Sequence, residues 1–226
     1  MPEDFNFIER LQRGCNAINL PELDNKALDR LHVYFKELKR WSKKINLIAR
    51  KATNSDILEK HFLDSLILLP LLDCDKIHLL DIGTGAGFPG LVCKAAKPEL
   101  QLTLVEPRQK RVAFLSHITR TLTFENVSIL DCRVEDEARL PSEGDFTHIT
   151  SRAVNDVKAF LAMSSRFMKP GVQVICMKGP KWQEELSAWE QNQNSRQYQV
   201  SSHKEYRLPQ SKVERHLLIF EQIDSF

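Results

Sequence analysis

The chain has 226 residues, and 32 Lys and Arg against 30 Asp and Glu leave a formal net charge of +2. This length suits one domain, or one domain with a short accessory segment, and the 42% apolar content is typical of a chain with a buried core. Near-neutrality excludes a polybasic binder that works by bulk charge alone, but it is compatible with a local basic face.

The first 75 residues have a helical pattern. Leu28, Leu31, Phe35 and Leu38 recur at three- and four-residue steps, which predicts a helix over 24–41 with one apolar face. Residues 57–72 are again apolar with a helical pattern, and Pro70 is expected to end that helix. We therefore expect residues 1–75 to form a helical accessory segment and residues 76–226 to form the main domain.

Strands and helices alternate from residue 77 onward. Short apolar runs predict buried parallel strands, and helices are expected over 108–122 and 154–168. The expected strands cover 77–82, 102–105, 127–130, 146–150, 172–177 and 213–220. Residues 183–197 are polar, with only a weak helical pattern. This alternation predicts an α/β fold with a doubly wound sheet.

A glycine-rich segment follows the first strand, with the sequence Asp81-Ile-Gly-Thr-Gly-Ala-Gly-Phe-Pro-Gly90. Glycine lets a backbone turn tightly and lets a ligand approach closely. Pro89 suits the first turn of a following helix, where its missing N–H is not needed. The segment therefore predicts a nucleotide-like ligand at the carboxyl end of the first strand.

Two ligands compete for this loop. Gly85-x-Gly87-x-x-Gly90 matches the dinucleotide fingerprint of a nicotinamide dehydrogenase. Asp81 would repel a pyrophosphate, however, and Asp-x-Gly-x-Gly-x-Gly is the pattern of enzymes that use S-adenosylmethionine, which carries an ammonium and a sulfonium. Glu106 ends the second strand, where it would accept hydrogen bonds from the ribose hydroxyls. We favour the methyltransferase and keep the dehydrogenase as an alternative.

The residues at the ends of the later strands narrow the choice of methyl acceptor. Neither an Asn-Pro-Pro-Tyr motif for an exocyclic amine nor a Pro-Cys nucleophile for a pyrimidine is present. Arg152 and Lys178 instead follow the fourth and fifth strands. A guanine N7 is a bare lone pair that needs orientation rather than deprotonation, and Arg and Lys are natural donors to guanine O6 and to phosphate. Taken alone, however, these two residues fit surface ion pairs better.

Two basic segments favour an RNA substrate. Residues 36–51 hold seven Lys and Arg against Glu37 alone, and residues 107–120 hold Arg108, Lys110, Arg111 and Arg120 without an acid. Such segments can bind phosphates, although a solvated helix face is their more common meaning.

The cysteines number five, at positions 15, 74, 93, 132 and 176, with no CxxC spacing. This odd, scattered set argues against a disulfide framework or a zinc site, so we expect reduced thiols and no metal. The longest apolar run, 66–72, is too short to span a bilayer, and the amino terminus carries no signal-peptide pattern. We expect a cytoplasmic protein and, without a long uncovered apolar stripe, a monomer.

The chain resembles the bacterial small-subunit rRNA guanine-N7 methyltransferases, long named glucose-inhibited division protein B. The motifs that carry the resemblance lie at 41–47, 61–66, 81–90, 110–115, 133–135, 151–153 and 178–179. Ser42 and Ile48 depart from the family pattern, which has Asn and Thr there, and this affects the amino-terminal RNA surface rather than the cofactor site.

The resemblance implies a class I S-adenosylmethionine-dependent methyltransferase, with a Rossmann-like sheet of seven strands, the last antiparallel, preceded by amino-terminal helices. It implies N7 methylation of guanine 527 in the 16S rRNA of the small ribosomal subunit. The implied cofactor-binding residues are Asp81, Gly83, Gly85, Gly87, Phe88, Glu106, Val134, Glu135 and Arg152. Arg152 and Lys178 are the implied catalytic residues, and His61 and Asp64 belong to a family motif without an assigned role.

Basic side chains that the resemblance and the basic segments place on the RNA are Lys43, Lys44, Arg108, Arg111 and Arg133. Two other functions stay open. One is a class I methyltransferase that acts on a small molecule or a protein, and the other is a non-catalytic RNA-binding assembly factor. If neutralising the basic segments left the activity unchanged, the substrate would be a small molecule or a protein rather than RNA. The intact Asp81 and Glu106 argue against a non-catalytic assembly factor.

Overall fold

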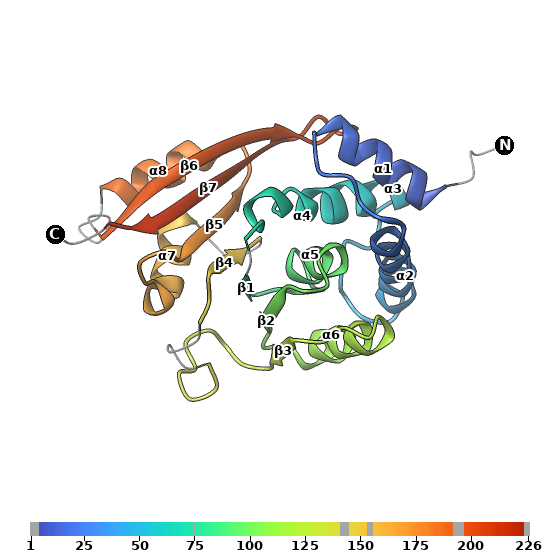
Figure 1. Ribbon diagram of the computed structural model, residues 1–226, viewed down its shortest axis with the longest axis horizontal. Helices are drawn as coiled ribbons and strands as arrows, with labels where there is room; N and C mark the ends of the chain where they lie inside the picture. The colour runs from blue at the N-terminus through green and yellow to red at the C-terminus, as the bar shows by residue number, and fades with distance from the viewer. Residues whose placement is uncertain (1–4, 75, 141–144, 153–155, 192–196, 224–226) are drawn as a thin grey trace.

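A seven-stranded sheet, in the order β3-β2-β1-β4-β5-β7-β6, lies between two helical layers in the computed structural model (Figure 1). The structure describes residues 5–74, 76–140, 145–152, 156–191 and 197–223. The strands are β1 (His78–Ile82), β2 (Gln101–Val105), β3 (Val127–Leu130), β4 (His148–Ser151), β5 (Gln173–Lys178), β6 (Tyr198–Arg207) and β7 (Glu214–Gln222). β1 to β5 pair in parallel, whereas β7 is antiparallel to β5 and β6. The expected doubly wound sheet with an antiparallel last strand is confirmed.

The two faces of the sheet bury different helices, because side chains alternate along each strand. Leu79 and Leu104 join the apolar cluster under α2 (Asn25–Ser42), α5 (Gly90–Ala96) and α6 (Gln109–Thr121). Leu80 and Val105 join the cluster under α7 (Val157–Ser164) and α8 (Trp182–Glu190). Strands buried on both faces need continuous apolar runs, which is why β1 and β2 stand out in the sequence.

The described region before β1 is built of two longer helices and four short helical pieces. They are α1 (Phe7–Ala17), α2, α3 (Asn54–Ile57), a π-helical turn η1 (Leu58–Leu63), α4 (Asp64–Leu66) and a 3₁₀ turn η2 (Leu69–Leu71). The predicted helix over 24–41 is confirmed as α2, which Asp24 caps by accepting from the Ala27 N–H at 2.6 Å. The predicted helix over 57–72 is instead divided among four pieces, and Pro70 lies in the last of them.

Two elements were not predicted, α1 and β6. Gly14 and Cys15 stand on the buried side of α1, so small residues interrupt its apolar stripe. β6 is an edge strand with mostly exposed or half-buried positions, and its pairing with β7 defines it. The weak helical pattern over 183–197 corresponds to α8, and residues 192–196 lie outside the described part of the chain. Residues 153–155, at the start of the predicted helix 154–168, also lie outside it.

Aromatic packing joins the amino-terminal helices to the sheet. Tyr34 of α2 is fully buried, and its ring stacks on Phe88 at a centroid distance of 5.6 Å and an interplanar angle of 10°. Phe62 of η1 meets both rings edge-on, at 5.4 Å from Tyr34 and 5.6 Å from Phe88. Such pairs contribute about 0.5–1.5 kcal/mol beyond the area they bury. The amino-terminal segment and the sheet thus share one core.

Two buried carboxylates tie this segment to the β6–β7 hairpin. Asp64 accepts from the Tyr206 hydroxyl at 2.9 Å and from Arg215 Nε at 3.3 Å. Glu59 accepts from the backbone N–H groups of Gln210 and Ser211 between the two strands. Because these acids are 4% and 2% exposed, each needs its partners. Among the described residues, no helix is both long and apolar enough to cross a membrane.

We predict that Asp64→Asn lowers the free energy of unfolding by about 2 kcal/mol, because a buried carboxylate that accepts from Tyr206 and Arg215 becomes an amide. Urea denaturation monitored by circular dichroism measures the change. The matched control is Asp73→Asn, because the Asp73 side chain is 84% exposed and its ion pair with Lys97 at 3.1 Å should contribute less than about 0.5 kcal/mol. Equal effects of the two substitutions would contradict a stabilising role for the buried contacts of Asp64 with the β6–β7 hairpin.

Candidate functional site

The glycine loop crosses the carboxyl ends of β1 and β2. Gly83, Gly85 and Gly87 have φ values of 68°, 64° and 94°, a region that glycine enters without strain. The backbone N–H groups of Gly83 and Thr84 both donate to the Val105 carbonyl, at 2.9 and 3.2 Å, so the loop folds back over β2. Pro89 occupies the N-cap of α5, one position before the helix begins.

The glycines of the loop differ in what surrounds them. A Cβ on Gly85 would find only the Arg111 guanidinium at 3.7 Å and the Gly83 carbonyl at 3.9 Å, so a ligand can approach closely. A Cβ on Gly87 would lie 2.5 Å from the Tyr34 hydroxyl and 2.6 Å from Leu91. Gly85 therefore leaves space at the loop, whereas Gly87 allows α2 to pack against it.

Asp81 is fully buried at the carboxyl end of β1. Its Oδ2 accepts from the Thr84 hydroxyl at 2.7 Å and from the Gly90 N–H at 2.9 Å. Its Oδ1 has no hydrogen-bond partner among the described residues. Burial is the main reason that the pKa of this carboxyl is raised to about 7. A buried acceptor without a partner suits a cationic or N–H-bearing ligand.

Glu106 faces the loop from the end of β2 and is 2% exposed. Its Oε2 accepts from the Gly85 N–H at 3.0 Å, and its Oε1 accepts from the Arg108 N–H at 2.9 Å. Arg111 of α6 lies 3.4 Å from Oε2. An ionised carboxylate offers about four acceptor positions and three donors already approach this one, so the hydroxyls of a ligand would take the remaining position or replace a donor. The acids expected at the first two strand ends thus lie on either side of one glycine loop.

The connection after β3 contributes the third part of the expected cofactor set. Val134 is buried, and its carbonyl accepts from the Arg166 guanidinium. Arg133 and Glu135, its two neighbours, are exposed. In the part of the chain that the structure describes, neither forms an ion pair.

Arg152 follows β4 and reaches across to the π-helical turn η1. Its Nη1 donates to the Lys60 carbonyl at 2.9 Å, and its Nη2 lies 2.7 Å from His61 Nδ1. Its guanidinium carbon stands 4.9 Å from the centroid of the Phe88 ring. Phe88 also stacks on His61 at 4.9 Å. The end of β4, the glycine loop and η1 therefore converge on Phe88.

Lys178 ends β5, the strand next to β4, and is 9% exposed. Its ammonium pairs with Glu185 of α8 at 2.9 Å. Glu185 also accepts from the Val157 N–H at the start of α7. The predicted surface ion pairs are thus replaced by a largely buried one at Lys178 and by backbone and imidazole contacts at Arg152.

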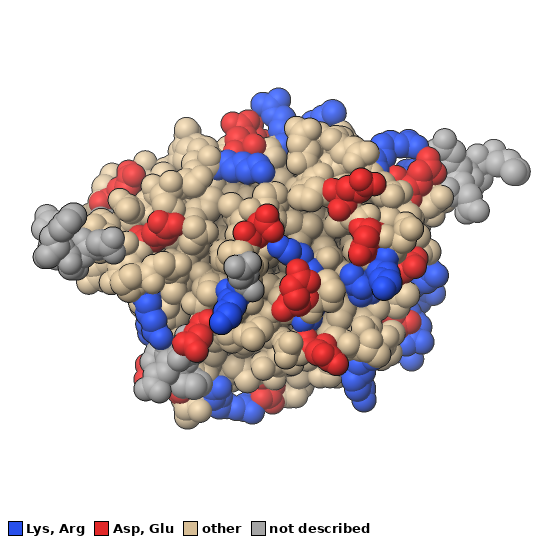
Figure 2. Space-filling view, viewed as in Figure 1, with Lys and Arg blue, Asp and Glu red and all other residues tan. Residues whose placement is uncertain are grey.

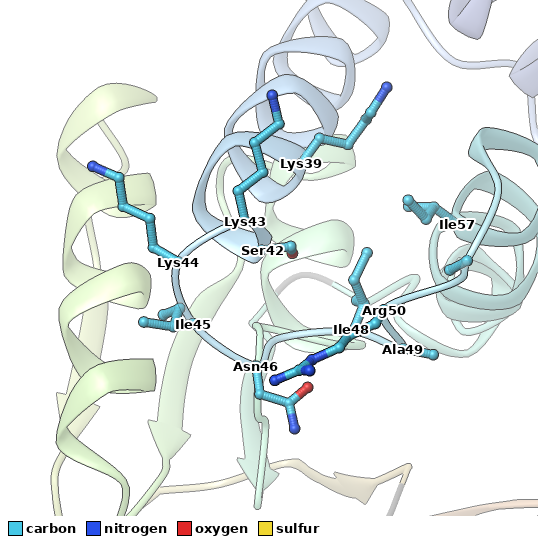
Figure 3. A pocket seen from close by; sticks show the side chains of 11 residues that line it. Lys39, Ser42, Lys43, Lys44, Ile45, Asn46, Ile48, Ala49, Arg50 and Ile57 are labelled. Atoms are coloured by element: carbon cyan, nitrogen blue, oxygen red, sulfur yellow. The ribbon is translucent and has the colours of Figure 1, made fainter.

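A basic hollow lies between the end of α2 and the start of α3, with a volume of about 450 Å³ (Figure 3). The long basic side chains around it are Lys39, Lys43, Lys44 and Arg50. Lys43 and Lys39 project from the end of α2, and the Arg50 and Asn46 side chains come from the loop that follows (Figure 3). Ser42 also lines the hollow, and its hydroxyl is buried without a hydrogen-bond partner among the described residues.

The five expected RNA-binding residues do not form one cluster. Lys43 and Lys44 line the hollow, Arg108 is exposed beside α6, Arg111 pairs with Glu106, and Arg133 is exposed after β3. Lys and Arg are interspersed with Asp and Glu over much of one face, and several gather along the margin where α2 and α6 lie (Figure 2).

Sequence reasoning did not assign Tyr34, Thr84 or Glu185 to this region, and it left His61 without a role. Thr84 and Tyr34 hold the loop through Asp81 and through the Ala86 carbonyl, which accepts from the Tyr34 hydroxyl. Only the spacing of Asp81 and Thr84 within the motif offered a sequence signal, because the other contacts join residues far apart in the chain.

Comparison with known proteins gives a family match over most of the chain. The family described as rRNA small subunit methyltransferase G matches residues 27–218. A relative named ribosomal RNA small subunit methyltransferase G from Desulfotalea psychrophila is 52% identical over 95% of this chain and 98% of its own length. One with the same name from Myxococcus xanthus is 36% identical over 96% and 98%.

Solved structures match the fold at low sequence identity. A putative transferase from Pyrococcus horikoshii has a TM-score of 0.54 at 14% identity, covering 72% of this chain and 64% of that one. TYW2 from M. jannaschii in complex with AdoMet has a TM-score of 0.53 at 12% identity, covering 69% and 73%. These similarities place the sheet in the class I methyltransferase fold.

We predict that Gly83→Asp abolishes binding of S-adenosylmethionine in calorimetry, because it strains the turn at φ 68° and adds a negative charge beside Asp81. The matched control is Gly171→Asp, which introduces the same side chain at φ 85° in a turn where a Cβ meets nothing within 4 Å. That variant should bind like the wild type. Wild-type affinity in Gly83→Asp would disprove the loop assignment.

We also predict a pH dependence of stability that originates at Asp81. Its pKa is near 3.8 in an unfolded chain and about 7 in the folded one, so between these values the folded state holds a proton that the unfolded state lacks. The free energy of unfolding of the ligand-free protein should therefore fall as pH rises from about 4 to about 7, and level off above. Urea denaturation of wild type and Asp81→Asn isolates this slope, and parallel profiles would contradict it.

Proposed function

Because the chain belongs to the rRNA small subunit methyltransferase G family, we propose that it transfers a methyl group from S-adenosylmethionine to N7 of guanine 527 in 16S rRNA. The observation that carries the proposal is the meeting of three parts at neighbouring strand ends. These parts are the unpaired oxygen of Asp81, the carboxylate of Glu106 across the loop, and Arg152 above Phe88.

The loop residues fit S-adenosylmethionine. Bound there, the cofactor supplies a methyl group on a sulfonium, which needs no further activation. Asp81 Oδ1 would accept from its amino group, and Glu106 would accept from the ribose hydroxyls in place of some of its present donors. The open side of Gly85 admits the ligand. The remaining proposed contacts are Gly83, Gly87, Phe88, Val134, Glu135 and Arg152.

The methyl acceptor requires positioning rather than a base. An N7 lone pair carries no proton that has to leave before transfer, so the protein would supply orientation and no base. We assign Arg152 and Lys178 to hold the guanine O6 or an adjacent phosphate. Lys178 pairs with Glu185 at 2.9 Å and ends β5, the strand beside β4, which leads into Arg152.

The RNA would extend from this site over basic side chains of both segments. We assign Lys43 and Lys44 to phosphates at the basic hollow, and Arg108, Arg111 and Arg133 to phosphates nearer the loop. We propose that residues 1–75 are the accessory segment of a methyltransferase domain at 76–226, and their shared core supports a fixed RNA surface. The protein would act as a cytoplasmic monomer on the small ribosomal subunit.

The test combines radiolabelled S-adenosylmethionine with small subunits from a strain that lacks the gene. Cleavage chemistry specific for 7-methylguanosine then maps the label, which we expect on one guanine of 16S rRNA. Label on another base or on protein would contradict the proposal.

The RNA surface is tested with the double charge reversal Lys43→Glu and Lys44→Glu. It should lower labelling about 10-fold at physiological salt and leave cofactor affinity unchanged.

The matched control reverses two exposed lysines away from the hollow, Lys26→Glu and Lys169→Glu. It changes the net charge by the same amount, so it measures the effect of bulk charge alone. If both pairs lower labelling equally, the hollow has no specific part in RNA binding.

A further inference from the structure

His61 lies in a π-helical turn that faces the glycine loop. In η1 the Asp64 N–H reaches back five residues to the Glu59 carbonyl, instead of the four of an α-helix. Single π-helical turns occur frequently at functional sites. The side chain of His61 stacks on Phe88, while the carbonyl of the preceding Lys60 accepts from Arg152. The turn thus presents two successive acceptors to one guanidinium.

The contact between His61 and Arg152 fixes the protonation of the imidazole. A guanidinium carries only donors, so at 2.7 Å from Arg152 Nη2 the Nδ1 atom of His61 must accept. The proton of the neutral ring is then on Nε2. Burial, followed by the charges of Arg152 and Lys60, lowers the pKa of His61 to about 3, against the opposing charge of Asp56. The imidazole therefore remains a neutral acceptor at physiological pH.

These contacts leave the guanidinium little freedom. It is held by the Lys60 carbonyl and by His61 at two different nitrogens, and it lies over the Phe88 ring, 4.9 Å from the centroid. Within the described residues, two of its five N–H groups are used in this way, which leaves three for another acceptor. Because Phe88 belongs to the glycine loop, the arrangement also sets the distance between Arg152 and the loop.

We propose that His61 is a positioning residue for methyl transfer, which orients Arg152 by accepting a hydrogen bond at Nδ1 while it stacks on Phe88. The inference rests on the proposed function, because Arg152 is taken to hold the guanine or its phosphate. In this proposal His61 acts through Arg152 and is assigned no contact of its own with the cofactor or the RNA. Its effect is to keep the free N–H groups of Arg152 aimed before the RNA binds.

Two substitutions separate the acceptor from the ring. His61→Phe keeps a ring against Phe88 but removes the acceptor, whereas His61→Asn removes the ring but restores a carbonyl acceptor close to the Nδ1 position. Single-turnover methylation of small subunits should fall roughly 10- to 100-fold in His61→Phe, because misplacement by about 1 Å has effects of that size. His61→Asn should recover most of the rate. Calorimetric affinity for S-adenosylmethionine should fall much less than the rate does in His61→Phe, because the other proposed cofactor contacts are kept.

A double-mutant cycle with Arg152→Ala tests whether His61 acts through Arg152. In the Arg152→Ala background, His61→Phe should lower the remaining rate no further. Additive losses, or a wild-type rate in His61→Phe alone, would overturn the inference. So would a rate in His61→Asn as low as in His61→Phe. Absence of label on RNA from the wild-type enzyme would instead contradict the proposed function, so the two failures are distinguishable.

Discussion

One buried carboxyl group constrains the centre of this protein. Asp81 lies near the carboxyl end of β1 in the middle of the sheet, and its Oδ2 accepts from both the Thr84 hydroxyl and the first N–H of α5. Gly90 cannot be larger, because a Cβ there would lie 2.9 Å from that oxygen. Burial disfavours the ionised form of the Asp81 carboxyl, and a cationic partner would favour it. The loop is therefore built around an acid that keeps one oxygen, Oδ1, without a hydrogen-bond partner among the described residues.

The amino-terminal helices complete the site as well as the core. The Tyr34 hydroxyl donates to the Ala86 carbonyl inside the glycine loop, and His61 and Phe62 pack on Phe88. The near-neutral net charge of the chain is compatible with acidic and basic residues that gather in different places. Acids occupy the interior around the loop, while Lys43 and Lys44 stand at the basic hollow. Local arrangement, rather than net charge, would then select an RNA.

The sequence predicted those parts whose signal is local. The glycine loop, Asp81, Glu106 and the buried strands each follow from residues close together in the chain, and the structure places them as expected. The edge strand β6 has no apolar alternation in its sequence, and its strand conformation becomes evident only from its pairing with β7. The contact of His61 with Arg152 spans 91 residues, and no local pattern encodes such a pair. Long-range polar contacts are therefore what the sequence left open.

The buried contacts of Asp64 and Glu59 with the β6–β7 hairpin affect folding during synthesis on the ribosome. Asp64 and Glu59 are made early, but their partners Tyr206 and Ser211 follow 142 and 152 residues later. At about 5–20 residues per second, these two acids wait on the order of 10 s before they can be buried with partners. The emerging chain thus keeps these two acids hydrated until the β6–β7 hairpin has been made, and closure of this part of the fold waits for that hairpin.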